Sequence, residues 1–289
     1  MIFIVLKMVG LCVKFVKMHG LGNDYIYIDD RKNEINEYAK LVPMLSNRHF
    51  GIGGDGVILI RESKLADFKM DMYNADGTQS EMCGNGIRCV GKYVYDYGLK
   101  KSKRLLIETL AGIKSLELII ENDRVLEVCV DMGKPILEPE LIPVKLDGEK
   151  IVRRKVEIQN NVFEITCVSM GNPHVVIVVD NLDEYDVAKY GAMIEKDELF
   201  PRRTNVEFVE IIGEDEIKMR VWERGTGETL ACGTGACAAV VAMKLGGYIN
   251  KKDVLVRLPG GRLDICWEEG KSVMMQGAAT KVFEGMWEK

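Results

Sequence analysis

This sequence of 289 residues has few histidines and lacks the paired cysteines that commonly bind metals. It contains only three histidines (His19, His49 and His174), and none of its eight cysteines belongs to a C-x-x-C pair. Structural zinc sites draw on such histidines and pairs, so we expect no metal. Because a chain of this length can bury a core without disulfide staples, the cysteines indicate a reducing, cytoplasmic compartment.

An excess of charge of one sign and a long hydrophobic run are also lacking. The 39 basic and 44 acidic residues leave a net charge of −5, which does not indicate a nucleic-acid partner. The apolar start, MIFIVLKMVGLCV, is interrupted by Lys7 and is shorter than the roughly 20 residues that span a membrane. It also lacks a signal-peptide cleavage pattern. We therefore expect no membrane association and interpret residues 1–12 as an extension.

Nucleotide-binding motifs are absent as well. The phosphate-binding pattern G-x-x-x-x-G-K-[ST] does not occur. The segment GIGGDG (51–56) has the glycine spacing of the dinucleotide fingerprint, which needs a strand before it and a helix after it. Here a helix-like segment precedes the glycines and the strand-like VILI (57–60) follows them, so we predict no nucleotide site.

The sequence does contain an internal repeat with an offset of 149 residues. Strand-like and helix-like segments follow one another in the same order in both halves. The helix-like segments 84–97 and 233–245 both begin in a Cys-Gly-x-Gly turn, CGNG at 83–86 and CGTG at 232–235. The same offset takes Asn23 to Asn172. We predict an ancient duplication, with two similar domains that face each other across a cleft and contribute one such turn each.

A cysteine directly before a helix has a distinctive chemistry. The unpaired N–H groups of a helix start favour the thiolate, and such cysteines have a pKa of roughly 3.5 to 7.5 instead of about 8.5. If Cys83 and Cys232 lie on opposite sides of one carbon, one sulfur can remove a proton and the other can deliver one to the opposite face. This arrangement predicts inversion of a stereocentre next to a carboxylate, without metal, flavin or pyridoxal.

Other interpretations of the cysteines remain open. The glycine turns alone would suit two ordinary helix starts, although this does not explain why cysteine precedes both. A disulfide between Cys83 and Cys232 would instead suit a thiol-based redox or ligand-binding protein. Cysteine is among the most buried residue types, and we interpret the other six as packing residues: Cys12, Cys89, Cys129, Cys167, Cys237 and Cys266.

Six motifs together resemble those of the diaminopimelate epimerase family, in order and spacing, from about Val13 to the C-terminus. They are KMHGLGNDY (17–25), NADG (74–77), CGNGIRC (83–89), GNPH (171–174), ERGTGET (223–229) and ACGTGACA (231–238). Proline-racemase-like enzymes of the wider superfamily also use two cysteine thiols as an acid–base pair. GLGND together with ERGTGET favours the diaminopimelate branch, and a racemase for another amino acid is the alternative.

The resemblance implies an isomerase that interconverts LL- and meso-diaminopimelate in lysine biosynthesis, with no cofactor and often as a homodimer. It implies an α+β fold of two pseudo-symmetric domains, each a mixed β-sheet or barrel around a central helix. We expect an N-terminal domain at 1–132 and a C-terminal domain at 133–277. The last strand, 278–289, is expected to return to the first domain.

The resemblance also implies roles for individual residues. Cys83 and Cys232 are the expected acid–base pair, and His174 and Glu223 are expected to modulate their pKa, although His174 also suits a purely structural role. Gly56 stands where some family members carry a glutamine, so one polar substrate contact is expected to be missing. The expected substrate-binding residues are Asn23, Asn74, Gly84, Asn85, Asn172, Asn205, Glu223, Arg224, Gly233 and Thr234.

Without the resemblance, these polar residues have ordinary explanations. An asparagine in a turn often satisfies nearby backbone groups. An adjacent glutamate and arginine, as at Glu223 and Arg224, usually form a solvated surface pair. In the epimerase interpretation, Glu223 binds the ammonium and Arg224 the carboxylate of the substrate's second, unreactive amino-acid head.

Overall fold

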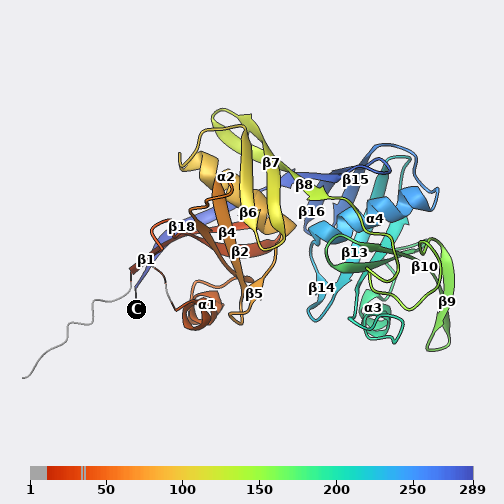
Figure 1. The fold of residues 1–289 in the computed structure, drawn as a ribbon. Coiled ribbons are helices and arrows are strands. Elements are labelled where there is room, and N and C mark those ends of the chain that lie inside the picture. The colour runs from red at the N-terminus through yellow and green to blue at the C-terminus, as the bar shows by residue number, and fades with distance from the viewer. Residues whose placement is uncertain (1–11, 34, 36, 289) are drawn as a thin grey trace, which may run out of the picture.

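The computed structural model describes residues 12–33, 35 and 37–288. Of the predicted extension at 1–12, only Cys12 lies within these residues. Figure 1 shows two bodies of strands, each with a helix running through it and a second helix beneath it. In the described part of the chain, no helix is long and apolar enough to cross a membrane.

The elements of the two halves follow the same order. The first half contains β1 (Cys12–Gly20), β2 (Asn23–Asp29), α1 (Tyr38–Ser46), β3 (Gly56–Arg61), β4 (Phe68–Asn74), β5 (Gln79–Ser80), α2 (Gly84–Asp96), β6 (Arg104–Thr109), β7 (Gly112–Glu121) and β8 (Arg124–Gly133). The second half contains β9 (Arg154–Ile158), β10 (Asn161–Ser169), β11 (Pro173–Val178), α3 (Val187–Glu195), β12 (Asn205–Ile211), β13 (Glu216–Glu223), β14 (Gly227–Thr229), α4 (Gly233–Leu245), β15 (Asp253–Leu258), β16 (Gly261–Cys266), β17 (Val273–Ala278) and β18 (Thr280–Glu288).

The 149-residue offset relates these elements closely. It takes β1, α1, α2 and β6 onto β10, α3, α4 and β15, with the same first and last residue in every case. The predicted α+β fold with two pseudo-symmetric bodies is therefore confirmed.

Strand pairing repeats in the same way. Neighbouring strands follow the order β1-β2-β3-β4-β6-β7-β8 in the first half and β10-β11-β12-β13-β15-β16-β17 in the second. The parallel pairs fall at equivalent places, β2–β3 with β11–β12 and β4–β6 with β13–β15. The halves join at the antiparallel pair β8–β17, and β18 pairs with β1 as β9 pairs with β10. Both sheets are thus mixed, as predicted.

A central helix fills each sheet. Helix α2 packs against β1, β2, β7 and β8, and α4 packs against β10 to β12 and β15 to β17. Almost the whole of α4 (GTGACAAVVAMKL) is buried, as expected for a helix that is apolar on all sides. Its small alanines allow the strands to approach closely. These contacts fix where both helices begin, and each begins one residue after a cysteine.

Two local features of the fold were not predicted from the sequence. Helix α1 begins at Tyr38, and Pro43 lies inside it without breaking it, because Leu41, Val42 and Leu45 pack into one apolar cluster with β2 and β3. The hairpin of β9 and β10 was not predicted. The expected domain boundary at 132–133 falls at the end of β8, and we retain it as a proposal.

Candidate active site

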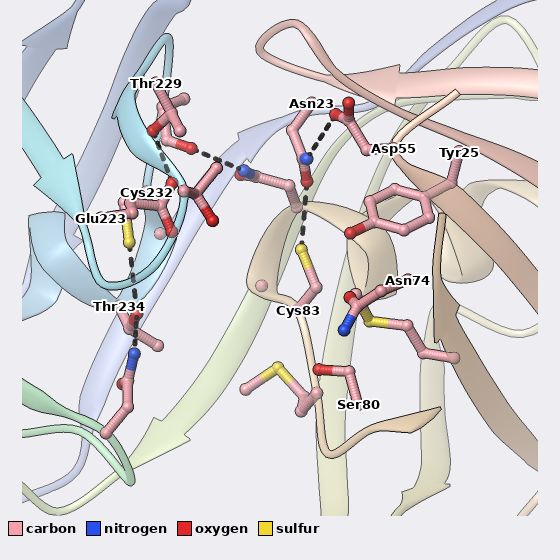
Figure 2. Close-up of a pocket in the computed structure, with 18 of the residues that line it drawn as sticks. Asn23, Tyr25, Asp55, Asn74, Ser80, Cys83, Glu223, Thr229, Cys232 and Thr234 are labelled. Carbon is pink, nitrogen blue, oxygen red and sulfur yellow. Dashed lines mark hydrogen bonds between the residues drawn. The ribbon is translucent and has the colours of Figure 1, made fainter. Parts of the chain in front are cut away.

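The starts of α2 and α4 lie side by side. A Cβ atom added to Gly233 would lie 3.7 Å from the Cα atom of Gly84, with Met275 packed against both glycines. Cys83 and Cys232, which precede these glycines, line one cavity of about 1100 Å³ to which both halves contribute. Figure 2 shows the two sulfurs on opposite sides of this cavity. The duplication therefore presents two thiols to one space.

Each cysteine caps its own helix. The Cys83 sulfur accepts a hydrogen bond from the Gly86 N–H at 3.4 Å, and the Cys232 sulfur accepts one from the Gly235 N–H at 3.4 Å. Both donors are closely packed glycines, since an added Cβ would lie 2.7 Å from the Ile58 Cδ1 in the first half and 2.7 Å from the Glu207 Oε1 in the second. The predicted helix-start chemistry is therefore present in both halves.

The effect on the thiols differs from the sequence prediction. Burial raises the pKa of Cys83 above its ordinary value, although the N–H groups of Gly86 and Asn85 oppose this. Burial also raises the pKa of Cys232, and the negative charges of Glu223 and Glu207 raise it further. The predicted lowering of both pKa values was wrong for the substrate-free protein, because loss of hydration outweighs the helix N–H groups.

An amide of fixed orientation faces Cys83. The Cys83 thiol donates to the Asn23 Oδ1 at 3.2 Å, and the Asn23 Nδ2 donates to the Asp55 carboxylate at 2.8 Å. Arg48 in turn holds Asp55 at 2.8 Å. Since a carboxylate only accepts hydrogen bonds, Asp55 turns the amide oxygen toward the sulfur, as Figure 2 shows.

A longer chain of side chains reaches Cys232. The Thr234 hydroxyl lies 3.4 Å from the sulfur and accepts from the Asn172 Nδ2 at 3.3 Å. The Asn172 Oδ1 lies 3.0 Å from the Nε2 of His174, whose Nδ1 lies 2.7 Å from Glu207. His174 and Glu207 are completely buried behind the cavity wall. His174 therefore does not face the cavity and can act on Cys232 only through Asn172 and Thr234.

All ten residues predicted to bind substrate line the cavity. Some of their side chains also hold backbone groups. The Asn85 amide donates to the Ala231 carbonyl of the other half at 3.3 Å. The Asn205 amide donates to the Pro173 carbonyl and accepts from the Arg224 N–H, both at 2.9 Å. These two asparagines thus fix the shape of the cavity.

Glu223 and Arg224 are the two charged residues among those predicted to bind substrate. Glu223 accepts a hydrogen bond from the Thr229 hydroxyl, and burial raises the pKa of its carboxyl. The Arg224 guanidinium donates to the Arg202 carbonyl at 3.1 Å. It forms no ion pair with any residue in the described ranges, so it is available to an anionic ligand.

Sequence reasoning missed several residues of the site. Tyr25 also lines the cavity, and Asp55, Glu207 and Arg88 hold the groups around the sulfurs. The buried Arg88 donates to the Asn85 Oδ1 at 3.0 Å and to the Gly84 carbonyl at 3.1 Å. The only sequence signal for Glu207 was its position two residues after Asn205, on a strand that reads as partly solvent-facing.

Gly56 has a structural explanation. An added Cβ would lie 2.0 Å from the Tyr73 carbonyl oxygen and 2.9 Å from the Tyr25 ring. No side chain fits at this position without a backbone shift. A glutamine is therefore excluded here by the neighbouring strand and ring.

Comparison with known proteins agrees with this geometry. The sequence profile of the family described as diaminopimelate epimerase matches residues 15–138 and 166–282. A diaminopimelate epimerase of Methanococcus maripaludis is 53% identical over 274 residues, covering 94% of this chain and 99% of the relative. One of Leptospira biflexa is 53% identical over 275 residues, covering 94% and 98%.

Solved structures share the fold at low sequence identity. A hydroxyproline epimerase from Agrobacterium vitis superposes with a TM-score of 0.71 at 12% identity, covering 96% of this chain and 92% of that one. A PhzF-family phenazine biosynthesis protein of Bacillus anthracis gives 0.70 at 16% identity, covering 96% and 99%.

These structural likenesses establish the fold alone. The family assignment rests instead on the profile, which covers most of the chain, and on relatives that are more than half identical over almost their whole length. On these grounds, the chain belongs to the diaminopimelate epimerase family.

Proposed function

We propose that the chain interconverts LL- and meso-diaminopimelate by moving the α-proton between Cys83 and Cys232. Membership of the family makes the chain an isomerase, an amino-acid epimerase of lysine biosynthesis. The observation that carries the proposed mechanism is the pair of sulfurs at two adjacent helix starts on one cavity. No cofactor takes part in the proposed reaction.

In this mechanism, one thiolate removes the α-proton from one face while the opposite thiol delivers a proton to the other. The two sulfurs exchange roles with the direction of reaction. Negative charge develops on the substrate carboxylate as the proton leaves. The N–H groups at the starts of α2 and α4, including those of Gly84 and Gly233, stabilise this charge.

The raised thiol pKa values need a compensating charge before reaction. The α-ammonium of the substrate supplies one, because a positive charge near a thiol favours its ionised form. Binding thereby couples to ionisation in this proposal. The sulfur becomes a base only when a zwitterion occupies the cavity, which limits oxidation of the free protein.

In this proposal, the second, unreactive head of the substrate lies against Glu223 and Arg224. Glu223 accepts its ammonium and Arg224 binds its carboxylate through a two-pronged contact. Amides of Asn23, Asn74 and Asn172 can donate and accept, which suits a zwitterion. This distal pair is what favours diaminopimelate over an amino acid with a single head.

Proton exchange tests the proposal directly. The reduced protein, treated with a chelator and given no cofactor, is incubated in D₂O with each diaminopimelate isomer. We expect deuterium at the α-carbon and formation of the other isomer. Cys83→Ala and Cys232→Ala are expected to abolish epimerisation. Cys237→Ala, a buried cysteine of α4 that does not line the cavity, is expected to retain it.

Other outcomes would favour other functions. Absence of exchange with fully reduced thiols overturns the proposal. Exchange on proline-like substrates but not on diaminopimelate would favour a racemase. A reversible Cys83–Cys232 disulfide without exchange on any amino acid would favour a thiol-based redox protein.

We also propose a cytoplasmic homodimer. The eight cysteines are free, which supports a reducing compartment. On β18, Val282 and Met286 are exposed by 55% and 65%, and such apolar surface suits contact with a second copy. Light scattering is expected to give twice the chain mass of 32.5 kDa. The double variant Val282→Lys, Met286→Lys is expected to give the monomer mass.

A further inference from the structure

We propose that Glu207 is a positioning residue for Cys232. It fixes His174 as a donor through its Nε2–H and thereby sets the direction of a hydrogen-bond chain that ends on the Cys232 sulfur. The chain runs from Glu207 through His174, Asn172 and Thr234. This inference rests on the proposed acid–base role of Cys232.

The first step is the state of the buried pair. Glu207 and His174 are both fully buried, and their nearest atoms lie 2.7 Å apart. The second carboxylate oxygen of Glu207 has no hydrogen-bond partner in the described part of the chain. On the other side of the ring, the Nε2 of His174 lies 3.0 Å from the Asn172 Oδ1, which only accepts. The two ring contacts therefore need two hydrogens, one at the Nε2 and one between the Nδ1 and Glu207.

The hydrogen at the 2.7 Å contact with Glu207 can lie on either group, and His174 presents the same donor to Asn172 in both cases. If the proton is on the imidazole, both ring nitrogens carry hydrogen. If it is on Glu207, the carboxyl donates to the Nδ1, and the neutral ring carries its hydrogen on the Nε2. In either arrangement, the Nε2 of His174 is a donor. It lies 3.0 Å from the Asn172 Oδ1, which only accepts.

The donor at His174 then sets which atom donates in each following hydrogen bond. With the Asn172 Oδ1 engaged by His174, its Nδ2 points to the Thr234 oxygen at 3.3 Å. Thr234 accepts that bond. Either atom could donate in its 3.4 Å contact with the Cys232 sulfur, and in the proposed chain the Thr234 hydroxyl is the donor. A donor aimed at the sulfur stabilises the thiolate rather than the thiol. Without a hydrogen on the Nε2, this nitrogen would accept, and every bond in the chain could reverse.

The first half shows that this chain is not a requirement of the fold. The 149-residue offset takes Ile58 to Glu207 and Tyr25 to His174. Ile58 lies against Gly86 as Glu207 lies against Gly235, with 2.7 Å to an added Cβ in both cases. An apolar residue therefore fills the same place under Cys83. Cys83 instead donates its own hydrogen to Asn23, so the two sulfurs have opposite hydrogen-bond environments.

The charge of Glu207 and its place in the hydrogen-bond chain have opposite expected effects on the pKa of Cys232. Glu223 on β13 and Glu207 on β12 face it with negative charge and raise its pKa, while His174 on β11 lies behind Asn172. Cys83 lies across the cavity. If Glu207 acted through its charge alone, its removal would lower the pKa of Cys232. If it acts by setting direction, its removal has the opposite effect, and the two explanations predict opposite signs.

The test measures the ionisation of Cys232 without substrate. In a Cys83→Ser background, the rate of alkylation of Cys232 by iodoacetamide is followed against pH by peptide mass spectrometry. Glu207→Ile introduces the residue of the other half. It is expected to raise the midpoint by about one pH unit, a roughly tenfold slower reaction at a pH below the midpoint. Ile58→Val, the matched control, is expected to leave the Cys232 midpoint unchanged.

A second measurement addresses the donor itself. In ¹⁵N-histidine spectra of the unsubstituted protein, the Nε2 of His174 is expected to carry hydrogen. In Glu207→Ile, it is expected to share that hydrogen with the Nδ1. Glu207→Gln, which retains size and can bond to either form, is expected to shift the alkylation midpoint upward by less than Glu207→Ile.

An unchanged or lowered midpoint in Glu207→Ile overturns the inference, as does an Nε2 without hydrogen in the unsubstituted protein. If Glu207→Ile does not fold, the sign of the Glu207→Gln shift decides in the same way. Because neither measurement uses diaminopimelate, failure here is distinguishable from failure of the proposed epimerase activity, which the D₂O exchange tests separately.

Discussion

Replacing the second glycine of each Cys-Gly-x-Gly turn, Gly86 or Gly235, provides a matched pair of perturbations. At Gly235, an added Cβ would lie 2.7 Å from the Glu207 Oε1 and 3.3 Å from the Cys232 sulfur. At Gly86, the same atom would meet the Ile58 Cδ1 at 2.7 Å and the Cys83 Cβ at 3.5 Å. The tip of an isoleucine can rotate away, whereas Glu207 is held by His174. Gly235→Ala should therefore disturb the site more than Gly86→Ala.

The expected magnitudes follow from two opposing effects. Alanine instead of glycine inside a helix stabilises by about 1 kcal/mol, and forcing an atom into a packed interior costs about 1–3 kcal/mol. The two nearly cancel for Gly86→Ala. For Gly235→Ala, we expect a net loss of roughly 1–2 kcal/mol in the free energy of unfolding. Displacement of the sulfur by even a fraction of an ångström should also lower kcat, since about 1 Å of misplacement can cost about 100-fold.

The assay combines urea unfolding with the α-proton exchange rate for both variants. We expect Gly86→Ala to retain a greater share of both stability and exchange. If Gly235→Ala unfolds and exchanges like Gly86→Ala, the argument that Glu207 is a rigid neighbour of the helix start is wrong.

Three further predictions follow from the same contacts. Cys83→Ala and Cys232→Ala should each lower the epimerisation rate by at least about 100-fold, as expected for loss of an acid–base group, and a variant with normal steady-state rates would refute the two-base assignment. Burial raises the pKa of Cys167 and Cys237 to about 12. Because their folded-state pKa lies above the unfolded value of about 9, the stability from these thiols is fully present below pH 9 and is lost as the pH rises toward 12. Urea unfolding at pH 8, 9.5 and 10.5 should show this fall, and a flat profile would contradict it. Arg88→Met removes the donor to Asn85 and Gly84 and should lower kcat more than it raises KM, and a pure KM effect would place Arg88 outside the support of the thiols.

The positions of the two catalytic helix starts could be predicted from the sequence because they depend on local sequence patterns. Cysteine followed by Gly-x-Gly placed both helix starts within one residue, and the constant offset of 149 residues related the halves before any coordinate was known. Glycine spacing and helix-start chemistry depend on residues that are neighbours in the sequence. Such features can therefore be predicted from the sequence alone. The hairpin of β9 and β10 escaped because β9 has only five residues, of which Val156 and Ile158 alone are apolar.

Burial depth was the information that the sequence could not supply. The helix N–H groups were evident from position, but the loss of hydration that reverses the direction of the pKa shifts depends on what covers the sulfurs. Glu207 was missed for the same reason. On a strand reading VEFVEI, a glutamate is expected to face solvent, yet Glu207 is fully buried, with Gly235 of α4 and His174 of β11 against its carboxylate.

The asymmetry between the halves is consistent with what a reversible two-base reaction requires. The proposed reaction needs one cysteine as the thiolate and the other as the thiol. If the two sulfurs had identical surroundings, the single thiol proton would be shared equally between them. Cys83 donates to the Asn23 amide oxygen, whereas Cys232 lies 3.4 Å from the Thr234 hydroxyl, which donates to it in the proposed chain. This difference favours the proton on Cys83 and acts against the carboxylates of Glu223 and Glu207, which raise the pKa of Cys232. A bias of about one pH unit corresponds to a ratio of about ten. This is enough to define a resting state, yet small enough that the proton can return when the reaction runs in the other direction. A bias of several units would hold the proton on one sulfur, so the neutral contacts seen here suit reversible epimerisation better than a strong ion pair at either thiol would.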